Sequence, residues 1–456
     1  MDTPPPVAPA ADPDRHRRGR NALKGAAVAY YVDMFDIYLP IIVLAPALIY
    51  FIPAHIDTAT TSLVGGAIFV ATLLGRPIGA AIFGHLADTI GRRRTTFIAV
   101  AGFGVCTLAL GLLPGYETWG SWAIVAFIAL RFIDGIFLGG EYTAANPLAM
   151  ENAEKRHRGL YSAIINCGFP MAYATASLLT VGLLAVMPSG DLDSAYVQWG
   201  WRIPFILGAL MAFGLLAYYR FAVDESDLWE HQEQGSGTKK RNPLRDLFSS
   251  AETRRGFLQV FVLMTGLWLA LQTAAAILPG VLSRTVGLSA SAVTAVLTIS
   301  YVTLIPSNIA VGLLSQRYGR RRVLIVLGAL ALTAGVGTYA ALVTARPSDL
   351  VTVTLLTILI VTIIDVPFAL MPAYINERFS IGVRSSGYGL AYSLSVIIPS
   401  FYSFYQLWLG KIMPADYTVL VLLAVGALLT IIGAARGPET KDLDLGASKP
   451  VELRAR

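Results

Sequence analysis

Two acidic side chains stand three residues apart inside the first long apolar run of the chain, residues 24–50. Asp33 and Asp36 lie on one face if this run is a helix, because positions i and i+3 are neighbours on a helix surface. Two carboxylates in a site of low dielectric repel each other, which favours proton uptake near neutral pH. We therefore expect a proton-coupling role for Asp33, Asp36 or both. The alternative is that an aspartate only pairs with an arginine of a neighbouring helix.

A second apolar run, residues 120–149, carries a stripe of ionisable side chains. Arg131, Asp134 and Glu141 recur at helical spacing and so share one face. A guanidinium group offers a bidentate fork to a carboxylate, so Arg131 and Asp134 are candidate substrate-binding residues. An ion pair internal to the protein is the equally weighted alternative for both. Glu141 is a candidate for proton coupling, with gating as the alternative, and Arg76 is interpreted as structural first and as a substrate attractor second.

Neutral polar and aromatic residues in the other apolar runs are candidates for lining a binding cavity. Amides fix the orientation of a ligand and aromatic faces fill volume, although packing between helices is the more common role of an aromatic residue. The candidates for the substrate site are Asn166, Trp268, Gln272 and Tyr392. Ionisable side chains are sparser in the second half of the chain, where Asp365 stands beside Pro367 in an apolar run.

Only membrane-spanning helices can position these residues. Hydrophobic residues make up 55% of the chain and charged residues 14%, whereas soluble proteins carry about 25% charged residues. This composition excludes a soluble globular protein. Apolar runs long enough to cross a bilayer, which takes about 20 residues, occur twelve times. The predicted spans are 24–50, 60–83, 95–113, 120–149, 159–187, 201–222, 256–281, 289–314, 323–344, 350–376, 386–410 and 417–435.

A repeated motif divides the chain into halves. Residues 84–94 and 312–322 share the spacing Gly-x6-Gly-Arg-Arg-Arg and lie 228 residues apart, half of the 456-residue length. Each copy separates two apolar runs and is predicted to be a short cytoplasmic loop, because its cations stay out of the hydrocarbon. A repeat of this period indicates two homologous halves of a transporter.

The distribution of cations predicts the topology. With the N-terminus in the cytoplasm, 28 of the 35 Lys and Arg residues fall in cytoplasmic segments, which places both termini inside the cell. The linker between the halves contains the basic run Lys239-Lys240-Arg241 and a short helix predicted around residues 243–248. The predicted segments are a disordered N-terminal tail (1–23), a six-helix half (24–222), a cytoplasmic linker (223–255), a second six-helix half (256–435) and a C-terminal tail (436–456).

These motifs resemble those of a known family. Residues 84–94 match the loop G-x-L-x-D-x-x-G-R-R-R of the major facilitator superfamily, and Gln316 in the second copy departs from its acidic position. Residues 131–142 and 199–205 resemble its metabolite:proton symporters, whereas Asp-Met-Phe-Asp at 33–36 is more similar to its aromatic-acid symporters. The resemblance implies an all-α membrane protein with twelve transmembrane helices in two pseudo-symmetric six-helix halves.

Charged residues between the spans are expected to form a latch on the cytoplasmic face. The pattern Glu151-x6-Arg158 recurs as Glu377-x6-Arg384, and the resemblance implies that Asp88 is the acidic member of an inter-helix ion pair. Breaking such pairs would accompany opening toward the cytoplasm. The expected latch and hinge residues are Gly84, Asp88, Gly91, Arg92, Glu151, Arg158, Gly312, Gly319, Arg320, Glu377 and Arg384.

The pattern as a whole predicts a secondary active transporter in the cell membrane. It would take up a small organic acid or zwitterionic metabolite with protons by alternating access. A sugar porter, another uniporter or exporter, and a non-transporting membrane sensor are the alternatives. An enzyme is not expected, because the sequence contains no metal constellation, phosphate loop or nucleophile elbow. The expected partners are a small-molecule substrate and the lipid bilayer, with protons as coupling ion and without cofactor, nucleic acid or obligate protein partner.

Overall fold

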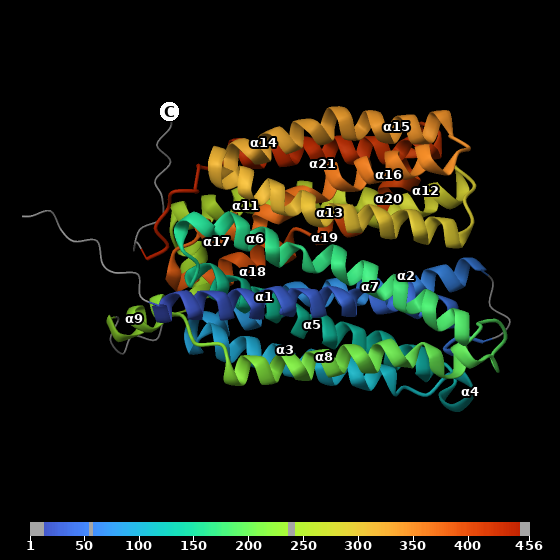
Figure 1. Cartoon of the computed structure of the whole chain (residues 1–456), viewed down its shortest axis with the longest axis horizontal. Coiled ribbons are helices and arrows are strands. Elements are labelled where there is room, and N and C mark those ends of the chain that lie inside the picture. Colours follow the sequence, from blue (N-terminus) through green and yellow to red (C-terminus); the bar gives the residue numbers. More distant parts are fainter. Residues whose placement is uncertain (1–12, 54–57, 236–241, 447–456) are drawn as a thin grey trace, which may run out of the picture.

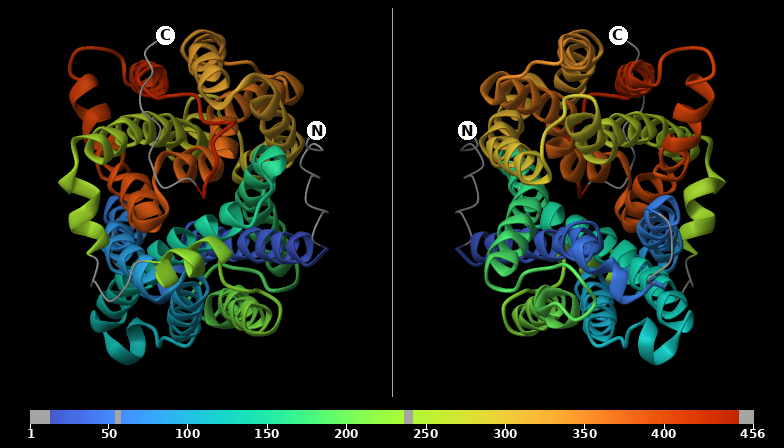
Figure 2. Two further views of the ribbon diagram at one scale, coloured as in Figure 1. Left: turned by 90° about the vertical axis from the view of Figure 1, so that its left-hand side faces the viewer. Right: turned by 90° about the vertical axis from the view of Figure 1, so that its right-hand side faces the viewer.

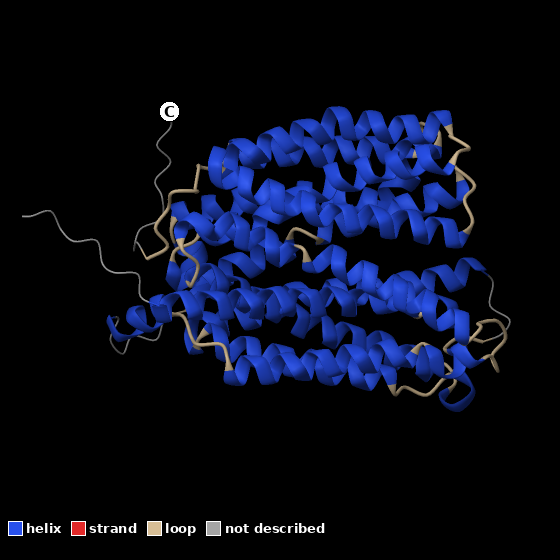
Figure 3. Cartoon of the chain, in the orientation of Figure 1, coloured by secondary structure: helices blue, strands red, loops and turns tan. Residues whose placement is uncertain are grey.

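The structure, a computed structural model, describes residues 13–53, 58–235 and 242–446. This part of the chain folds into helices and loops without a strand (Figure 3). The long helices run roughly along one axis and form two groups, which lie in the lower and upper parts of Figure 1. Seen from either end, the groups face each other across a central interface (Figure 2). The predicted all-α fold in two halves is confirmed.

The N-terminal half is built from long α-helices interrupted by short 3₁₀- or π-helical turns, which carry the label η. Its elements are α1 (Pro13–Tyr38), η1 (Leu39–Val43), η2 (Ala45–Tyr50), α2 (Thr58–Ile90), α3 (Arg92–Gly111), α4 (Tyr116–Trp119), α5 (Trp122–Glu151), η3 (Lys155–His157), α6 (Arg158–Asn166), α7 (Gly168–Val186), η4 (Tyr196–Gly200) and α8 (Arg202–Phe221).

The linker and the C-terminal half follow the same scheme. The linker contains α9 (Asp227–Gly235) and α10 (Pro243–Ser249), so the helix predicted around residues 243–248 is confirmed. The elements of the second half are α11 (Ala251–Gln272), η5 (Thr273–Ile277), α12 (Leu278–Arg284), α13 (Ala290–Tyr318), α14 (Arg320–Leu330), η6 (Ala331–Gly335), α15 (Val336–Ala345), α16 (Leu350–Asp365), η7 (Val366–Leu370), α17 (Met371–Arg378), η8 (Ile381–Val383), α18 (Arg384–Leu394), α19 (Ile397–Ser400), α20 (Tyr402–Leu409), η9 (Ala415–Tyr417) and α21 (Thr418–Ala435).

Within the described ranges, eleven helical stretches are long and apolar enough to cross a membrane. The twelfth predicted crossing, residues 386–410, is divided among α18, α19 and α20, and Pro399 in α19 cannot donate a helical hydrogen bond. Large apolar side chains cover the outside of the bundle, among them Phe221 (85% exposed) and Trp122 (74% exposed). Such a surface suits hydrocarbon, where helices satisfy their own backbone groups.

The first helix begins earlier than the sequence indicated. Residues 13–23, assigned to a disordered tail, are helical and continue into the first span. Arg18 Nη1 forms an ion pair with Asp227 of α9 at 2.6 Å, and Asn21 Nδ2 donates to the Ala222 carbonyl at 2.8 Å. These contacts hold the N-terminal end of α1 against the start of the linker. Residues 1–12, 447–456 and the run 239–241 lie outside the described residues.

The motif of residues 84–94 is almost wholly helical rather than a loop. Helix α2 continues to Ile90 and α3 starts at Arg92, so only Gly91 separates them. Its φ is 105°, and Gly319 has a φ of 103° at the equivalent point between α13 and α14. Such dihedrals suit glycine alone without strain. The repeated motif is therefore a pair of one-residue breaks between consecutive helices.

Glycines allow α2 and α5 to pack with their backbones in close approach. A Cβ atom at Gly79 would lie 1.9 Å from the Ile136 carbonyl oxygen, and one at Gly135 would lie 2.1 Å from that of Thr72. Small residues at such crossings permit the van der Waals packing that holds helices together in lipid. The crossing also places Arg76, on α2, beside α5.

We expect Gly79→Ala to destabilise the protein by about 1–3 kcal/mol, because the added methyl group must push the two backbones apart. The measurement is thermal unfolding of the purified protein in detergent. Gly66→Ala on the same helix is the matched control, since no heavy atom lies within 4 Å of its added Cβ. Equal melting temperatures for the two variants would contradict close packing at this crossing.

Candidate substrate and proton-coupling site

An ion pair buried in the middle of the bundle forms the centre of the candidate site. Arg76 Nη2 of α2 donates to Asp33 Oδ1 of α1, and the two side chains are 3% and 0% exposed. Among the described residues, Asp33 Oδ2 and Arg76 Nε have no hydrogen-bond partner. These two atoms can therefore still form hydrogen bonds with a ligand or a water molecule.

Aromatic side chains from both halves surround Arg76. Its guanidinium lies 5.2 Å from the ring centroid of Tyr142 in α5, and the ring of Tyr142 packs at 5.0 Å against Tyr392 of α18. Trp268 of α11 contacts Tyr392 edge-on at 5.1 Å and donates from Nε1 to its carbonyl oxygen at 3.0 Å. The hydroxyl of Tyr142 is hydrogen-bonded to Ser393. Arg76 therefore lies where the two halves meet.

Arg131 belongs to a separate cluster inside the N-terminal half. Its Nη1 contacts Asp36 Oδ2 at 2.6 Å and Asp134 Oδ2 at 2.7 Å, while Thr107 of α3 donates to Asp36 Oδ1 at 2.7 Å. The guanidinium also lies over the ring of Phe205 in α8, 5.9 Å from its centroid. Arg131 Nε and Asp134 Oδ1 have no hydrogen-bond partner among the described residues, but two carboxylates already face this one guanidinium. A third carboxylate would add to an excess of negative charge, so the geometry is that of an internal ion pair.

The remaining predicted site residues are buried on three different helices. Glu141 is buried on α5 within electrostatic range of Asp33 and Arg76, and its Oε2 has no hydrogen-bond partner in the described part of the chain. Asn166, at the end of α6, is buried with Nδ2 likewise unpartnered. Gln272 is the buried last residue of α11, one turn after Trp268. The structure thus places Asp33, Glu141 and Tyr392 near Arg76, with Trp268 packed against Tyr392. Arg131 pairs instead with Asp36 and Asp134.

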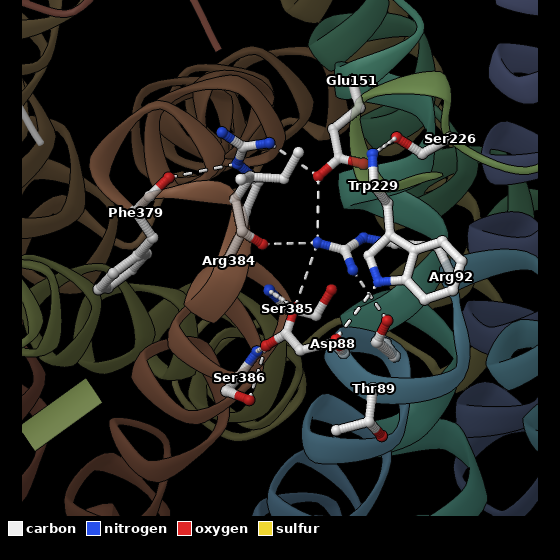
Figure 4. A network of polar contacts seen from close by, with 12 residues as sticks. Asp88, Thr89, Arg92, Glu151, Ser226, Trp229, Phe379, Arg384, Ser385 and Ser386 are labelled. Atoms are coloured by element: carbon white, nitrogen blue, oxygen red, sulfur yellow. Dashed lines mark hydrogen bonds and ion pairs between the residues drawn. The ribbon is translucent and has the colours of Figure 1, made fainter. Parts of the chain in front are cut away.

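Charged residues at the end of the bundle that carries the repeated motif form a connected network (Figure 4). Glu151, the last residue of α5, accepts from Arg92 of α3 at 3.3 Å and from Arg384 of α18 at 2.7 Å. Arg92 also pairs with Asp88 at 3.2 Å. The Glu151–Arg384 contact crosses between the halves, so the network closes this end of the central interface.

Asp88 reaches the other half through hydrogen bonds. Its carboxylate accepts from the backbone N–H groups of Ser385 and Ser386 at 3.1 and 2.9 Å, and from the Ser386 hydroxyl at 2.8 Å. These donors lie in the first turn of α18, where N–H groups lack helical partners and the helix dipole favours an anion. Its ion-pair partner, Arg92, is on the same half, so a helix N-terminus provides the contact across the interface. A Cβ atom at Gly84 would lie 2.9 Å from Ser386 Cα, so a glycine permits this close approach.

The second copy of the motif forms a similar network, but fewer of its hydrogen bonds cross between the two halves. Arg320 pairs with Glu377 at 3.3 Å, and Gln316 accepts from the Gly159 N–H of α6 at 3.1 Å. A Cβ atom at Gly312 would lie 2.6 Å from the Gly159 carbonyl oxygen. Arg158 donates to the Leu443 carbonyl at 2.7 Å. Gln316, a neutral amide, thus forms one hydrogen bond across the interface. Asp88, the carboxylate at the equivalent position, forms three.

Two glutamates that the sequence analysis missed complete the networks. Glu225 accepts from the N–H groups of Arg92 and Arg93 at 2.9 and 3.1 Å. Glu439 accepts from those of Arg320 and Arg321 at 2.7 and 3.2 Å. Burial raises the pKa of Glu225, and the hydrogen bonds from these N–H groups oppose that shift. Each glutamate follows the last span of its half and precedes a Ser or Thr, a signal that could have revealed this third repeat.

Comparison with known proteins agrees with this architecture. Residues 26–279 match the family model of the Major Facilitator Superfamily, and residues 230–449 match that of sugar (and other) transporters. The inner membrane metabolite transport protein YhjE of Escherichia coli is 30% identical over 82% of this chain and 84% of its own length. The alpha-ketoglutarate permease of Escherichia coli is 29% identical over 83% and 84%. A structure of the proton:xylose symporter XylE matches with a TM-score of 0.71 and 16% identity, over 92% of this chain and 95% of XylE.

Two helical halves, a buried polar site at their interface and a network of ion pairs at one end are the architecture of a multi-pass membrane transporter for small molecules. It is not an enzyme, and its relatives carry metabolites. The chain belongs to the major facilitator superfamily, as the family model matching more than half of its length shows.

Proposed function

We propose that the protein takes up a small carboxylate-bearing metabolite together with a proton, with Arg76 as the ligand of the carboxylate and Asp33 as the proton carrier. The observation that carries the proposal is the buried Arg76–Asp33 pair at the interface between the halves. Arg131, the candidate favoured by the sequence, already faces two carboxylates through its Nη1, so we assign the substrate role to Arg76.

The pair supplies a physical reason for coupling. When Asp33 takes up a proton, Arg76 loses its counter-ion in a site of low dielectric, where an unpaired charge is costly. A substrate carboxylate restores the pairing, so that proton and substrate each favour the binding of the other. With a monocarboxylate, the loaded site has the same net charge as the empty one, in which Asp33 is ionised. Both forms can therefore pass between the two open states of the transporter.

The relatives support the carboxylate. Alpha-ketoglutarate, from which one relative takes its name, is an organic acid, and the structural relative is described as a proton symporter. The alternative substrate class, a sugar, would leave Arg76 without a function when Asp33 is protonated. We further propose that both termini lie in the cytoplasm, on the strength of the cation distribution in the sequence. We also propose inward transport, because the motifs at residues 131–142 and 199–205 resemble those of metabolite:proton symporters.

Arg76→Lys should weaken carboxylate binding by about 10–100-fold, because an ammonium keeps the charge but loses the fork, and hydrogen bonds to charged groups contribute about 1.5–3 kcal/mol. The measurement is thermal stabilisation of the purified protein by a panel of carboxylates, betaines, amino acids and sugars, since a ligand of the folded state raises its stability. Arg131→Lys is the control and should retain the affinity. Loss of affinity in Arg131→Lys alone, or stabilisation only by uncharged sugars, would refute the assignment.

A further inference from the structure

Asp365 is a buried carboxylate without a partner in the C-terminal half. Its side chain is 1% exposed, and neither carboxylate oxygen accepts a hydrogen bond from a residue that the structure describes. It is the last residue of α16, which gives way to the 3₁₀ turn η7 containing Pro367. The carboxyl group therefore stands at the negative end of a helix of 16 residues, where the helix dipole favours a cation.

Aromatic rings from both halves lie near Asp365, because Tyr301, Phe169 and Tyr173 pack in the same apolar cluster as the two chain neighbours of Asp365. Tyr38 of α1 and Tyr301 of α13 lie within electrostatic range of its carboxylate. Tyr173 of α7 packs against both, with ring centroids 5.1 Å from Tyr38 and 4.3 Å from Tyr301. Phe169 completes the group at 5.9 Å from Tyr38 and 5.5 Å from Tyr301. Four aromatic rings thus lie close to a buried carboxyl group that has no hydrogen-bond partner among the described residues.

We propose that Asp365 and the rings of Tyr38, Phe169, Tyr173 and Tyr301 form a binding site for an organic ammonium group. Aromatic faces attract cations through their quadrupoles, and the attraction is strongest where water is excluded. An ammonium group would also supply the counter-ion that a buried carboxylate requires. A compact inorganic cation would need several oxygen ligands, whereas this site offers one carboxylate and ring faces.

The site lies across the interface that alternating access opens. Tyr38, Phe169 and Tyr173 belong to the N-terminal half, and Tyr301 and Asp365 belong to the C-terminal half. The rings touch one another while the halves are closed, and separation of the halves exposes the ring faces and the carboxylate together. A ligand can therefore enter when the interface opens and be enclosed when it closes.

Helix α1 connects this site to the proposed carboxylate site. Tyr38 follows Asp33 by five residues, which corresponds to about 7.5 Å along a helix axis and about 140° around it. A zwitterion therefore offers one charged group to each site, its carboxylate to Arg76 and its ammonium group to Asp365. This part of the inference rests on the proposed function and narrows its substrate class to amino acids and betaines.

The test compares isosteric ligands that differ in charge at the head group. Thermal unfolding of the purified full-length protein is titrated with glycine betaine, with 3,3-dimethylbutanoate, in which carbon replaces the quaternary nitrogen, and with tetramethylammonium. We expect wild type to bind glycine betaine about tenfold more tightly than its isostere. Asp365→Asn should abolish this preference, raise the melting temperature without ligand, and leave the binding of 3,3-dimethylbutanoate unchanged.

Control variants separate the site from general effects. Asp349→Asn makes the same chemical change at the exposed start of α16 and should preserve the preference for glycine betaine. Tyr301→Phe should preserve it as well, because the ring remains, whereas Tyr301→Leu should reduce it.

Two results would overturn the inference: no stabilisation of wild type by either ammonium probe, or an unchanged preference in Asp365→Asn. Binding of 3,3-dimethylbutanoate without binding of tetramethylammonium would refute the ammonium site, but it would agree with the proposed transport of a carboxylate. Asp365-dependent binding of tetramethylammonium without binding of any carboxylate supports the ammonium site and refutes the carboxylate assignment of Arg76.

Discussion

Asp33→Asn should abolish proton-driven accumulation of the solute while leaving exchange of solute across the membrane. The amide mimics a permanently protonated carboxyl group, so Arg76 is free to bind a substrate carboxylate at any pH, and the loaded transporter still changes state. In proteoliposomes with a pH gradient of about one unit, one coupled proton supports about tenfold accumulation of a monocarboxylate, since about 1.4 kcal/mol corresponds to a factor of ten. The variant should reach a ratio of about one, with counterflow retained.

Asp36→Asn is the matched control, because it makes the same change three residues away on α1. Asp36 shares Arg131 with Asp134, so its neutralisation leaves that guanidinium paired, and accumulation should persist. If Asp33→Asn still concentrates solute while Asp36→Asn does not, the proton is carried by the cluster around Arg131. Loss of folding, binding and exchange together in Asp33→Asn would make Asp33 a purely structural partner of Arg76.

The sequence predicted the fold well because membrane proteins leave few alternatives. Apolar runs of spanning length must be helices in lipid, and the repeated motif at residues 84–94 and 312–322 requires two related halves. The ends of the elements were harder to predict. The expected loop at 84–94 is helix except at Gly91, because one residue with positive φ suffices to turn the chain between α2 and α3.

The partners of the charged residues could not be derived from spacing alone. The stripe containing Arg131 and Asp134 correctly indicated a buried face, but a single sequence does not show that α1 supplies Asp36 to the same guanidinium. Arg76 stands beside Pro77 with no charged neighbour in its own run, so its pairing with Asp33 becomes visible only once α1 and α2 are packed. Spacing identifies residues on one helix, whereas the site depends on which helices lie side by side.

The latch should fail more severely when it is weakened at Asp88 than when it is weakened at Gln316. Asp88 accepts three hydrogen bonds from the first turn of α18, and bonds to a charged acceptor contribute about 1.5–3 kcal/mol against about 0.5–1.5 kcal/mol for neutral ones. Asp88→Asn removes the charge and should destabilise the closed end by about 1–3 kcal/mol, which shifts the closed–open equilibrium about 5–150-fold. Uptake should slow, because the state closed at this end becomes scarce, while the protein stays folded in the membrane.

Accessibility of a site beneath the latch measures this shift directly. Thr143 of α5 is fully buried against Gly389 of α18, across the interface and two turns from Glu151. The two native cysteines, Cys106 and Cys167, are buried and free, so both are first replaced by alanine. Maleimide should label Thr143→Cys about fivefold faster or more in the Asp88→Asn background, as the equilibrium argument requires. Gln316→Leu, which removes one hydrogen bond across the interface and one from Arg320 within its own half, should change the rate less. Labelling and uptake at wild-type levels in Asp88→Asn would mean that the motif acts only in setting the membrane topology. The cations of residues 92–94 favour the cytoplasmic side whether or not Asp88 contacts α18.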